Sequence, residues 1–365
     1  MINLSFFPSK RLAWYMAKLF LTRSLAVLAA LVVILMTLDL LGESGKILRV
    51  EGNGDAELWR YVGLRIPQLV SRFLPFAVLL GTLISLATLN QNSEIVSMKA
   101  AGISAHQIIA PLIVASLGVA ALTFLFNERV VTRATATLAA WEKVEYGPVP
   151  KDSGVTPNVW VRFGDDLIVT KEVRGTGAAT RLSGVTIHDR DWETLQGIVE
   201  AKTARFVGGE WELRDVTIFD VRTGTLSRAA LYRYGKGLDP TQFTLAKVNP
   251  DEETIGALRS AIGQLKGAGR DTADLETGLW HKFSGPLSAV LMPLLAAVAA
   301  FGLARSGQLF LRAIAGMALG FAYFVADNFA LAMGNLGAYP PLLAAWAPFA
   351  LFLLIGETVL VRTEE

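Results

Sequence analysis

The sequence contains no cysteine and few charged residues. None of its 365 residues is a cysteine, so disulfide bonds and thiolate-held metal centres are excluded. Only 18% of the residues are charged, whereas a soluble globular protein has about 25%. The net charge of +2 is too small to indicate a nucleic-acid partner. The residues are 52% hydrophobic and the mean hydropathy is +0.43, which together indicate a membrane protein.

Histidine is also scarce, and no cofactor or metal site is predicted. The three histidines lie far apart and show no ligand spacing; they are His106, His188 and His281. No catalytic residues are predicted either. Glu200, Glu210 and Glu212 alternate with apolar residues on expected strands, which is typical of a solvated face. The nearest approach to a phosphate loop, Gly45-Lys46, lacks the earlier glycine and the following Ser or Thr, so no nucleotide site is expected.

The sequence contains six long apolar segments. Three precede a polar block and three follow it, and each is long enough to cross a hydrocarbon core of about 30 Å. The expected spans are Ser24–Leu41, Arg65–Asn90, Ala105–Phe126, Gly278–Ala304, Leu309–Met333 and Pro341–Val361. A mixed-charge loop, Gly42–Leu64, is expected between the first two spans. The sequence therefore predicts six crossings, arranged as three plus three.

Basic residues indicate the orientation of these spans. They lie before the first span, between the fourth and fifth, and after the sixth: Lys10, Arg11, Lys18, Arg23, Arg305, Arg312 and Arg362. By the positive-inside rule, these segments and both termini are expected in the cytoplasm. Three crossings then put the polar block on the opposite side of the membrane.

The polar block, about Asn127–Thr277, is predicted to be an all-β domain. Val159–Val173 and Gly208–Val221 are apolar at every second position, as in half-buried strands. Gly208-Gly209 indicates a two-residue hairpin, and another strand is expected at Phe243–Val248. Such a series predicts a meander, a sandwich or a jelly roll. After the strands, an amphipathic helix is expected from four residues on one helical face, Ile255, Leu258, Ile262 and Leu265.

The segment Asn90–Ser104 joins the second and third spans on the cytoplasmic side. Ser93 is expected to cap a short helix, and Gly102 suits its left-handed end. Ser104 and Gln107 form a possible capping box for the third span. Ile95, Val96 and Met98 give the short helix an apolar side. It either lies on lipid at the membrane surface or docks a cytoplasmic partner, and the residues alone leave both open.

The motif NSEIVSMKAAGIS in this segment resembles the cytoplasmic coupling segment of the lipopolysaccharide-export permeases of the LptF/LptG type. The central domain matches in pattern, and Leu265–Ala296 and Gly334–Pro348 match in order, so the resemblance covers essentially the whole chain. The motif FVADNFA, Phe324–Ala330, is closer to the LptG branch.

The resemblance implies a helical membrane protein of six spans with an inserted all-β, jelly-roll-like domain in the periplasm. The implied parts are residues 1–126 with a coupling helix at about 91–104, the β domain at 127–249, a connection at 250–277 and a second membrane half at 278–365. It implies a non-catalytic permease in the bacterial inner membrane, paired with an LptF-type permease and driven by two copies of a cytoplasmic ABC ATPase. The chain would extract lipopolysaccharide and pass it to periplasmic bridge proteins with related β folds.

Two sets of residues follow as candidate sites. By resemblance, ATPase coupling is assigned to Glu94, Ile95, Met98, Lys99 and Gly102. Ionisable groups in or near spans are assigned to substrate binding, because bases there could bind phosphates and acids would need basic partners: Asp39, Lys46, Arg49, Arg65, Arg133 and Asp327. Ordinary anchoring at the interface is the alternative. The family usually places bases directly after the acid that ends the first helix, but here Gly42 and Glu43 stand there.

Two other classes of protein stay open. One is a permease of another ABC exporter, such as a lipoprotein-release type, whose usual four-helix layout fits six spans badly. The other is a membrane-anchored periplasmic scaffold without a transport role.

Overall fold

The computed structural model describes residues 9–148, 155–175, 177–191, 194–244, 248–267, 270–302 and 309–362. The chain forms two units. A helical unit takes Met1–Val149, Pro250–Gly256 and Ala273–Glu365, and a β unit takes Pro150–Asn249 and Ala257–Thr272. Arg305, on which part of the orientation rests, lies outside the described residues.

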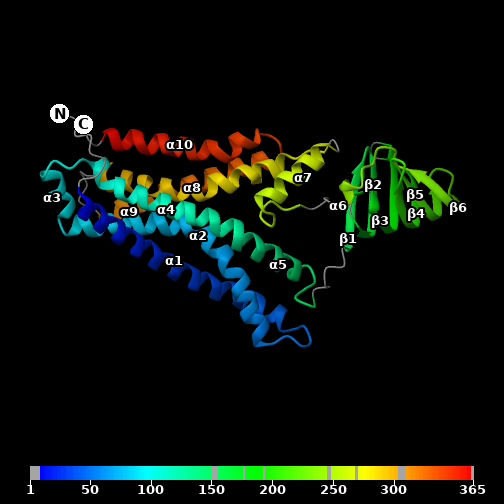
Figure 1. The fold of residues 1–365 in the computed structure, drawn as a ribbon, viewed down its shortest axis with the longest axis horizontal. Coiled ribbons are helices and arrows are strands. Elements are labelled where there is room, and N and C mark those ends of the chain that lie inside the picture. Colours follow the sequence, from blue (N-terminus) through cyan, green and yellow to red (C-terminus); the bar gives the residue numbers. More distant parts are fainter. Residues whose placement is uncertain are drawn as a thin grey trace. The chain divides into compact units, whose positions relative to one another are not determined.

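The helical unit consists of long helices and one short one (Figure 1). Before the β unit come α1 (Lys10–Ile47), α2 (Asp55–Gln91), α3 (Glu94–Ala100), α4 (Ala105–Phe126), a π-helical turn (Asn127–Val131) and α5 (Thr132–Glu142). After it come α8 (Ala273–Gly302), α9 (Leu309–Asn335) and α10 (Pro341–Arg362). Each predicted span lies within one of these helices, and residues 303 and 304, at the end of the fourth, lie outside the described residues.

Five helices of the described part are long and apolar enough to cross a membrane: Lys10–Ile47, Asp55–Gln91, Ala105–Glu142, Ile314–Asn335 and Pro341–Arg362. The remaining predicted span, the fourth, corresponds to α8, which has 30 residues and a length of about 45 Å. Together with the inserted sheet described below, these helices confirm the expected fold class.

The structure changes the predicted loop between the first two spans. Gly42–Leu64 was expected to be a loop, but α1 continues to Ile47 and α2 begins at Asp55. The start of α2 is stabilised by Glu57, whose carboxylate accepts a hydrogen bond from the Gly54 N–H at 2.9 Å. Likewise, α4 continues through the π turn into α5, so residues 127–142 are helical.

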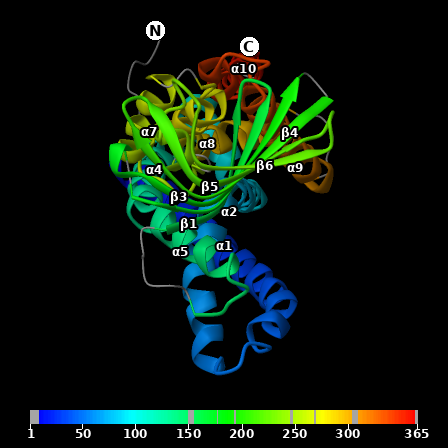
Figure 2. The same ribbon diagram turned by 90° about the vertical axis from the view of Figure 1, so that its right-hand side faces the viewer.

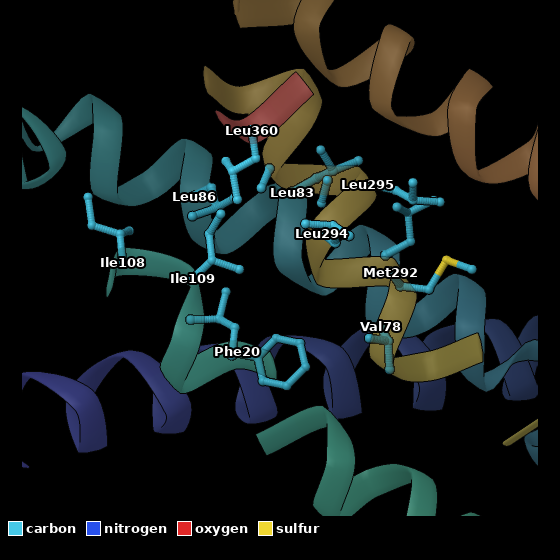
Figure 3. Packing of buried hydrophobic residues seen from close by; sticks show 14 of the residues in the cluster. Phe20, Val78, Leu83, Leu86, Ile108, Ile109, Met292, Leu294, Leu295 and Leu360 are labelled. Atoms are coloured by element: carbon cyan, nitrogen blue, oxygen red, sulfur yellow. The ribbon is translucent and has the colours of Figure 1, made fainter. Parts of the chain in front are cut away.

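A central apolar core joins the helices of this unit (Figure 3). Phe20 of α1, Ile109 of α4, and Leu294 and Leu295 of α8 all belong to it. All four are almost fully buried. The α1–α2 crossing is especially close, because a Cβ added at Gly81 would lie 2.6 Å from the Ser24 backbone. Small residues are typical of such close crossings in membranes.

The β unit contains one six-stranded antiparallel sheet in the order β1-β2-β3-β4-β5-β6. Its strands are β1 (Val155–Phe163), β2 (Asp166–Arg174), β3 (Arg181–Asp191), β4 (Thr194–Val207), β5 (Glu210–Asp220) and β6 (Thr225–Tyr234). Every strand pairs with the next in sequence, so of the three predicted architectures the described strands form the meander. Gly208 and Gly209, both with positive φ, make the predicted hairpin between β4 and β5.

The sheet is curved (Figure 2), and its buried apolar residues form one cluster. Ile168, Ile187 and Val199 stand opposite one another on β2, β3 and β4, and all are buried. The curvature brings β6 back to β2, where the Tyr234 hydroxyl donates to Asp166 at 2.5 Å. This contact links the last strand to the second across the curved sheet.

Two predictions that follow the strands had different outcomes. The strand expected at Phe243–Val248 is wrong at its start, because Thr241–Thr244 forms a short helix, α6. Phe243 is buried against Trp211, and this packing decides its local structure. The amphipathic helix is confirmed as α7 (Ile255–Gly267), with Leu258, Ile262 and Leu265 buried.

Candidate functional site

The short helix α3 lies at the end of the helical unit where α1 begins and α10 ends (Figure 1). Gly102 has the predicted left-handed conformation, φ +84°. Ser104 and Gln107 form the predicted capping box of α4. The predicted side-chain cap at Ser93 is wrong: Ser93 itself is left-handed, with φ 57°, and its hydroxyl makes no cap hydrogen bond. The turn before α3 therefore depends on a backbone conformation that is uncommon outside glycine.

The five coupling candidates divide between a buried side and an exposed side. Ile95 and Met98 are 6% and 7% exposed and belong to the central core, so they fix α3 to the membrane helices. Lys99 and Gly102 are exposed. Glu94 is half-buried and accepts a hydrogen bond from the Tyr15 hydroxyl of α1 at 3.3 Å. The helix α3 is thus fixed by the packing of Ile95 and Met98 in the core and by the hydrogen bond between Glu94 and Tyr15 of α1.

At the opposite end of α1, six residues form an outer charged cluster, defined as Asp39, Glu43, Lys46, Tyr61, Arg65 and Tyr146. Arg65 donates from Nε and Nη2 to the two oxygens of Asp39, each at 3.0 Å. Tyr61 adds a hydrogen bond to Asp39 at 2.6 Å, and Arg65 Nη1 donates to Gln68 at 2.8 Å. Most donors of Arg65 are therefore engaged within the protein.

Glu43 connects the second half of the outer charged cluster. It accepts from Lys46 Nζ and from the Tyr146 hydroxyl, each at 2.8 Å. Burial, together with the bond to Glu43, raises the pKa of Tyr146, so its hydroxyl stays a hydrogen-bond donor. Asn53 donates to the carbonyls of Ile47 and Tyr146, each at 2.9 Å. These contacts join the end of α1, the start of α2 and the segment after α5.

The remaining substrate candidates lie apart from these bonds. Arg49 and Arg133 are exposed, and no side-chain partner is found for either in the described part of the chain. The Lys46 side chain is 62% exposed despite its bond to Glu43. Asp327 is buried in α9 and faces His281 of α8, with Nε2 and Oδ2 3.4 Å apart. The structure therefore pairs Asp39 with Arg65 and Lys46 with Glu43, and it places Asp327 in a separate pair with His281.

Sequence reasoning missed the partners that organise these candidates. Tyr61 lies one helical turn before Arg65, and this spacing could have identified it. Tyr146 is 103 residues from Glu43, and no local pattern signals that contact. The histidine spacing gave no role to His281, because its pairing with Asp327 requires the packing of α8 on α9.

The arrangement offers anion binding and protein docking. Lys46 and Arg49 are exposed bases at the end of α1, Arg133 is an exposed base at the start of α5, and α3 offers a fixed, exposed face at the other end of the helical unit. Among the described residues, no group of three or more His, Asp or Glu side chains could hold a metal ion. Several membrane-length helices carrying an inserted antiparallel β domain define the class: a multi-span membrane protein with one large extramembrane domain.

The chain belongs to the family described as lipopolysaccharide export system permease LptF/LptG, whose model matches residues 14–362. It is 27% identical over 309 residues to the lipopolysaccharide export system permease protein LptG of Escherichia coli strain K12, covering 83% of this chain and 84% of that protein. It is also 27% identical over 357 residues to the LptG protein of Haemophilus influenzae strain Rd, covering 93% and 97%. Family membership and the apolar helices identify an inner-membrane protein.

Proposed function

We propose that this chain is one permease subunit of a transporter that extracts lipopolysaccharide from the inner membrane. It pairs with an LptF-type permease, and two copies of a separate cytoplasmic ABC ATPase supply the energy. Its β unit passes the lipid to periplasmic bridge proteins with related β folds, toward the outer membrane. The family match from residue 14 to residue 362 is the observation that carries this proposal.

The proposed topology places the inserted domain in the periplasm and both termini in the cytoplasm. The basic residues in the first part of α1, and Arg362 at the end of α10, support it through the positive-inside rule. The α3 end of the helical unit is then cytoplasmic, and the outer charged cluster faces the periplasm.

In this arrangement α3 is the docking helix for the ATPase. Ile95 and Met98 anchor α3 in the central apolar core. A movement of the ATPase against the exposed face that carries Lys99 would therefore be transmitted to the membrane helices. Glu94 and Gly102 set its position, through the bond to Tyr15 and the left-handed turn. Of the two interpretations that the residues left open, this one explains why the apolar residues Ile95 and Met98 pack into protein.

At the outer end, Lys46, Arg49 and Arg133 are the bases proposed to meet the phosphates of the lipid. Their exposure leaves hydrogen-bond donors available for charge-assisted contacts with phosphate. Asp39 and Arg65 neutralise each other and are proposed to shape this region. Asp327 is proposed to hold α9 to α8 through its pair with His281.

Purification from native membranes tests the proposal. The wild-type chain should retain a second permease, an ATPase and lipopolysaccharide, identified by mass spectrometry of proteins and lipids. Glu94→Lys should lose the ATPase while keeping the second permease. Tyr15→Phe removes only the hydrogen bond to Glu94, so comparing it with Glu94→Lys separates the loss of this bond from the reversal of charge on α3. A wild-type chain that purifies with no ATPase, or with lipoprotein-release components, would overturn the function.

A further inference from the structure

The start of α7 is held by a carboxylate from a distant part of the chain. Glu128 Oε1 accepts a hydrogen bond from the Ile255 N–H at 2.8 Å, across 127 residues of sequence. Ile255 is the first residue of α7, and the first N–H groups of a helix have no partner within that helix. A carboxylate at this place also interacts favourably with the helix dipole. Glu128 is therefore a cap for α7 that comes from outside α7.

This cap lies where the chain passes from one unit to the other. Pro250–Gly256 belongs to the helical unit, whereas Ala257–Thr272 belongs to the β unit. The segment Pro250–Gly256, here called the return segment, also packs closely on α8, because a Cβ added at Gly278 would lie 2.7 Å from Cγ of Pro250. Contacts to Glu128 and to α8 thus hold the return segment on the helical unit.

Glu128 belongs to the π-helical turn between α4 and α5, Asn127–Val131. A π turn inserts one residue into a helix, and such turns occur frequently at functional sites. The buried side-chain oxygen of Asn127 finds no hydrogen-bond partner among the described residues. A buried polar atom without a partner is unfavourable, so a second arrangement of the turn would relieve this cost. The turn therefore combines a fixed contact to α7 with a local cost that favours movement.

Charged residues lie on either side of this contact. Arg133, one of the exposed bases proposed to meet phosphates, follows the π turn by two residues. On α8, Lys282 interacts electrostatically with Glu128 and with two acids of the return segment, Asp251 and Glu253. Glu128 therefore has both a hydrogen bond to α7 and a cationic neighbour, and an experiment must separate the two.

We propose that Glu128 is a positioning residue for lipid transfer, which passes a movement of the π turn to α7 and so to the chain that continues into the β unit. This inference rests on the proposed function, which supplies the lipid and the transfer step. Phosphate binding at Arg133 acts on the same helical segment that carries Glu128. Loss of the cap should therefore separate ATP hydrolysis from lipid delivery without preventing assembly.

Two substitutions separate the hydrogen bond from the charge. Glu128→Ala removes the acceptor, whereas Glu128→Gln keeps a side-chain oxygen that can accept from the Ile255 N–H and removes the charge. Hydrogen exchange in the first turn of α7, measured by mass spectrometry on the assembled complex, should be about fivefold faster in Glu128→Ala than in the wild type. In Glu128→Gln it should stay near the wild-type rate.

Glu57→Ala is the matched control. Its parent carboxylate caps the start of α2 by accepting from the Gly54 N–H at 2.9 Å, so the variant also loses a helix cap. That cap is local and lies away from the return segment in sequence. Glu57→Ala should therefore change hydrogen exchange at the start of α2 and leave lipid delivery unchanged.

The functional measurement uses the purified complex in liposomes that contain lipopolysaccharide, with a soluble β-fold bridge protein as acceptor. Glu128→Ala should retain the second permease, the ATPase and ATP hydrolysis, while the lipid delivered per ATP falls about threefold or more. Glu128→Gln and Glu57→Ala should deliver lipid like the wild type.

Three results would overturn the inference: equal delivery by Glu128→Ala and the wild type, equal losses in Glu128→Ala and Glu128→Gln, or a loss of assembly in parallel with the loss of delivery. The second would mean that the charge matters and the cap does not. If the wild-type complex delivers no lipid, the proposed function fails first. The exchange rate of α7 still reports whether Glu128 caps it, so the two failures are distinguishable.

Discussion

Asp39 and Arg65 show what a charged pair does at the boundary of the membrane. Their side chains are 23% and 31% exposed, and two parallel hydrogen bonds join them. Breaking one partner of a buried pair leaves an uncompensated charge, which costs more than removing both partners.

We expect Asp39→Asn and Arg65→Gln each to lower the free energy of unfolding by about 1–3 kcal/mol, given partial exposure. The double variant should lose less than the sum, with a coupling of about 1 kcal/mol or more. Thermal unfolding of the purified chain in detergent measures all three variants. Lys46→Met is the control, because its surface pair should contribute about 1 kcal/mol or less. Strictly additive losses would show that the pair is not coupled.

Asp189 provides a pH-dependent test in the β unit. Partial desolvation, followed by the nearby Asp166 carboxylate, raises the pKa of Asp189 above its usual 3.8. The folded state then binds a proton more tightly than the unfolded state, so stability falls as the pH rises from 3.8 through the raised pKa.

Asp189→Asn removes this penalty. The variant should therefore unfold at a higher temperature than the wild type at pH 7, and the difference should disappear toward pH 4. Unfolding of the full chain in detergent, followed between pH 4 and pH 8, measures the effect. A difference that grows on acidification would show that the sign is wrong.

At the residue scale, the sequence identified charges but not their partners. Asp39, Arg65 and Asp327 were found because an ionisable residue in an apolar run stands out. Tyr146 and His281 were not, because their contacts depend on chain segments that meet only after folding. Ser93 followed the usual preference for a capping residue, but the sharp turn before α3 required a left-handed backbone instead.

At the scale of elements, the apolar segments located the long helices but did not predict where α1 ends and α2 begins. The predicted start of the third span, Ala105, and its capping box are confirmed, because Ser104 and Gln107 carry a local signal. The extensions of α1 and α2 carry polar residues, and packing of Ile47, Tyr61 and Trp141 into a second apolar core makes them helical. Hydropathy alone cannot show such packing.

The crossing of α1 and α2 gives an element-scale prediction. A Cβ at Gly81 would lie 2.6 Å from backbone atoms of Ser24, so Gly81→Ala should push the helices apart and cost about 1–3 kcal/mol. Gly118→Ala in α4 is the matched control, because nothing lies within 4 Å of the added Cβ. Thermal unfolding in detergent compares the two. Equal stability of both variants would mean that the crossing can relax.

At the scale of the whole molecule, the series of apolar helices and the inserted β domain were predictable because both depend on long, repeated patterns. The meander order with its closing Tyr234–Asp166 contact was not, since three architectures share the same alternation. Orientation rests on few basic residues, so it needs a direct test.

The absence of cysteine makes that test clean, because the wild-type chain is its own unlabelled control. Lys202→Cys lies in the sheet with its parent side chain 79% exposed, and Leu336→Cys lies between α9 and α10 at a residue 75% exposed. Both should react with a membrane-impermeant maleimide in spheroplasts. Ala100→Cys, exposed at the end of α3, should react only after lysis. Labelling of Ala100→Cys in intact spheroplasts, with protection of Lys202→Cys, would invert the topology and remove α3 from the reach of a cytoplasmic ATPase.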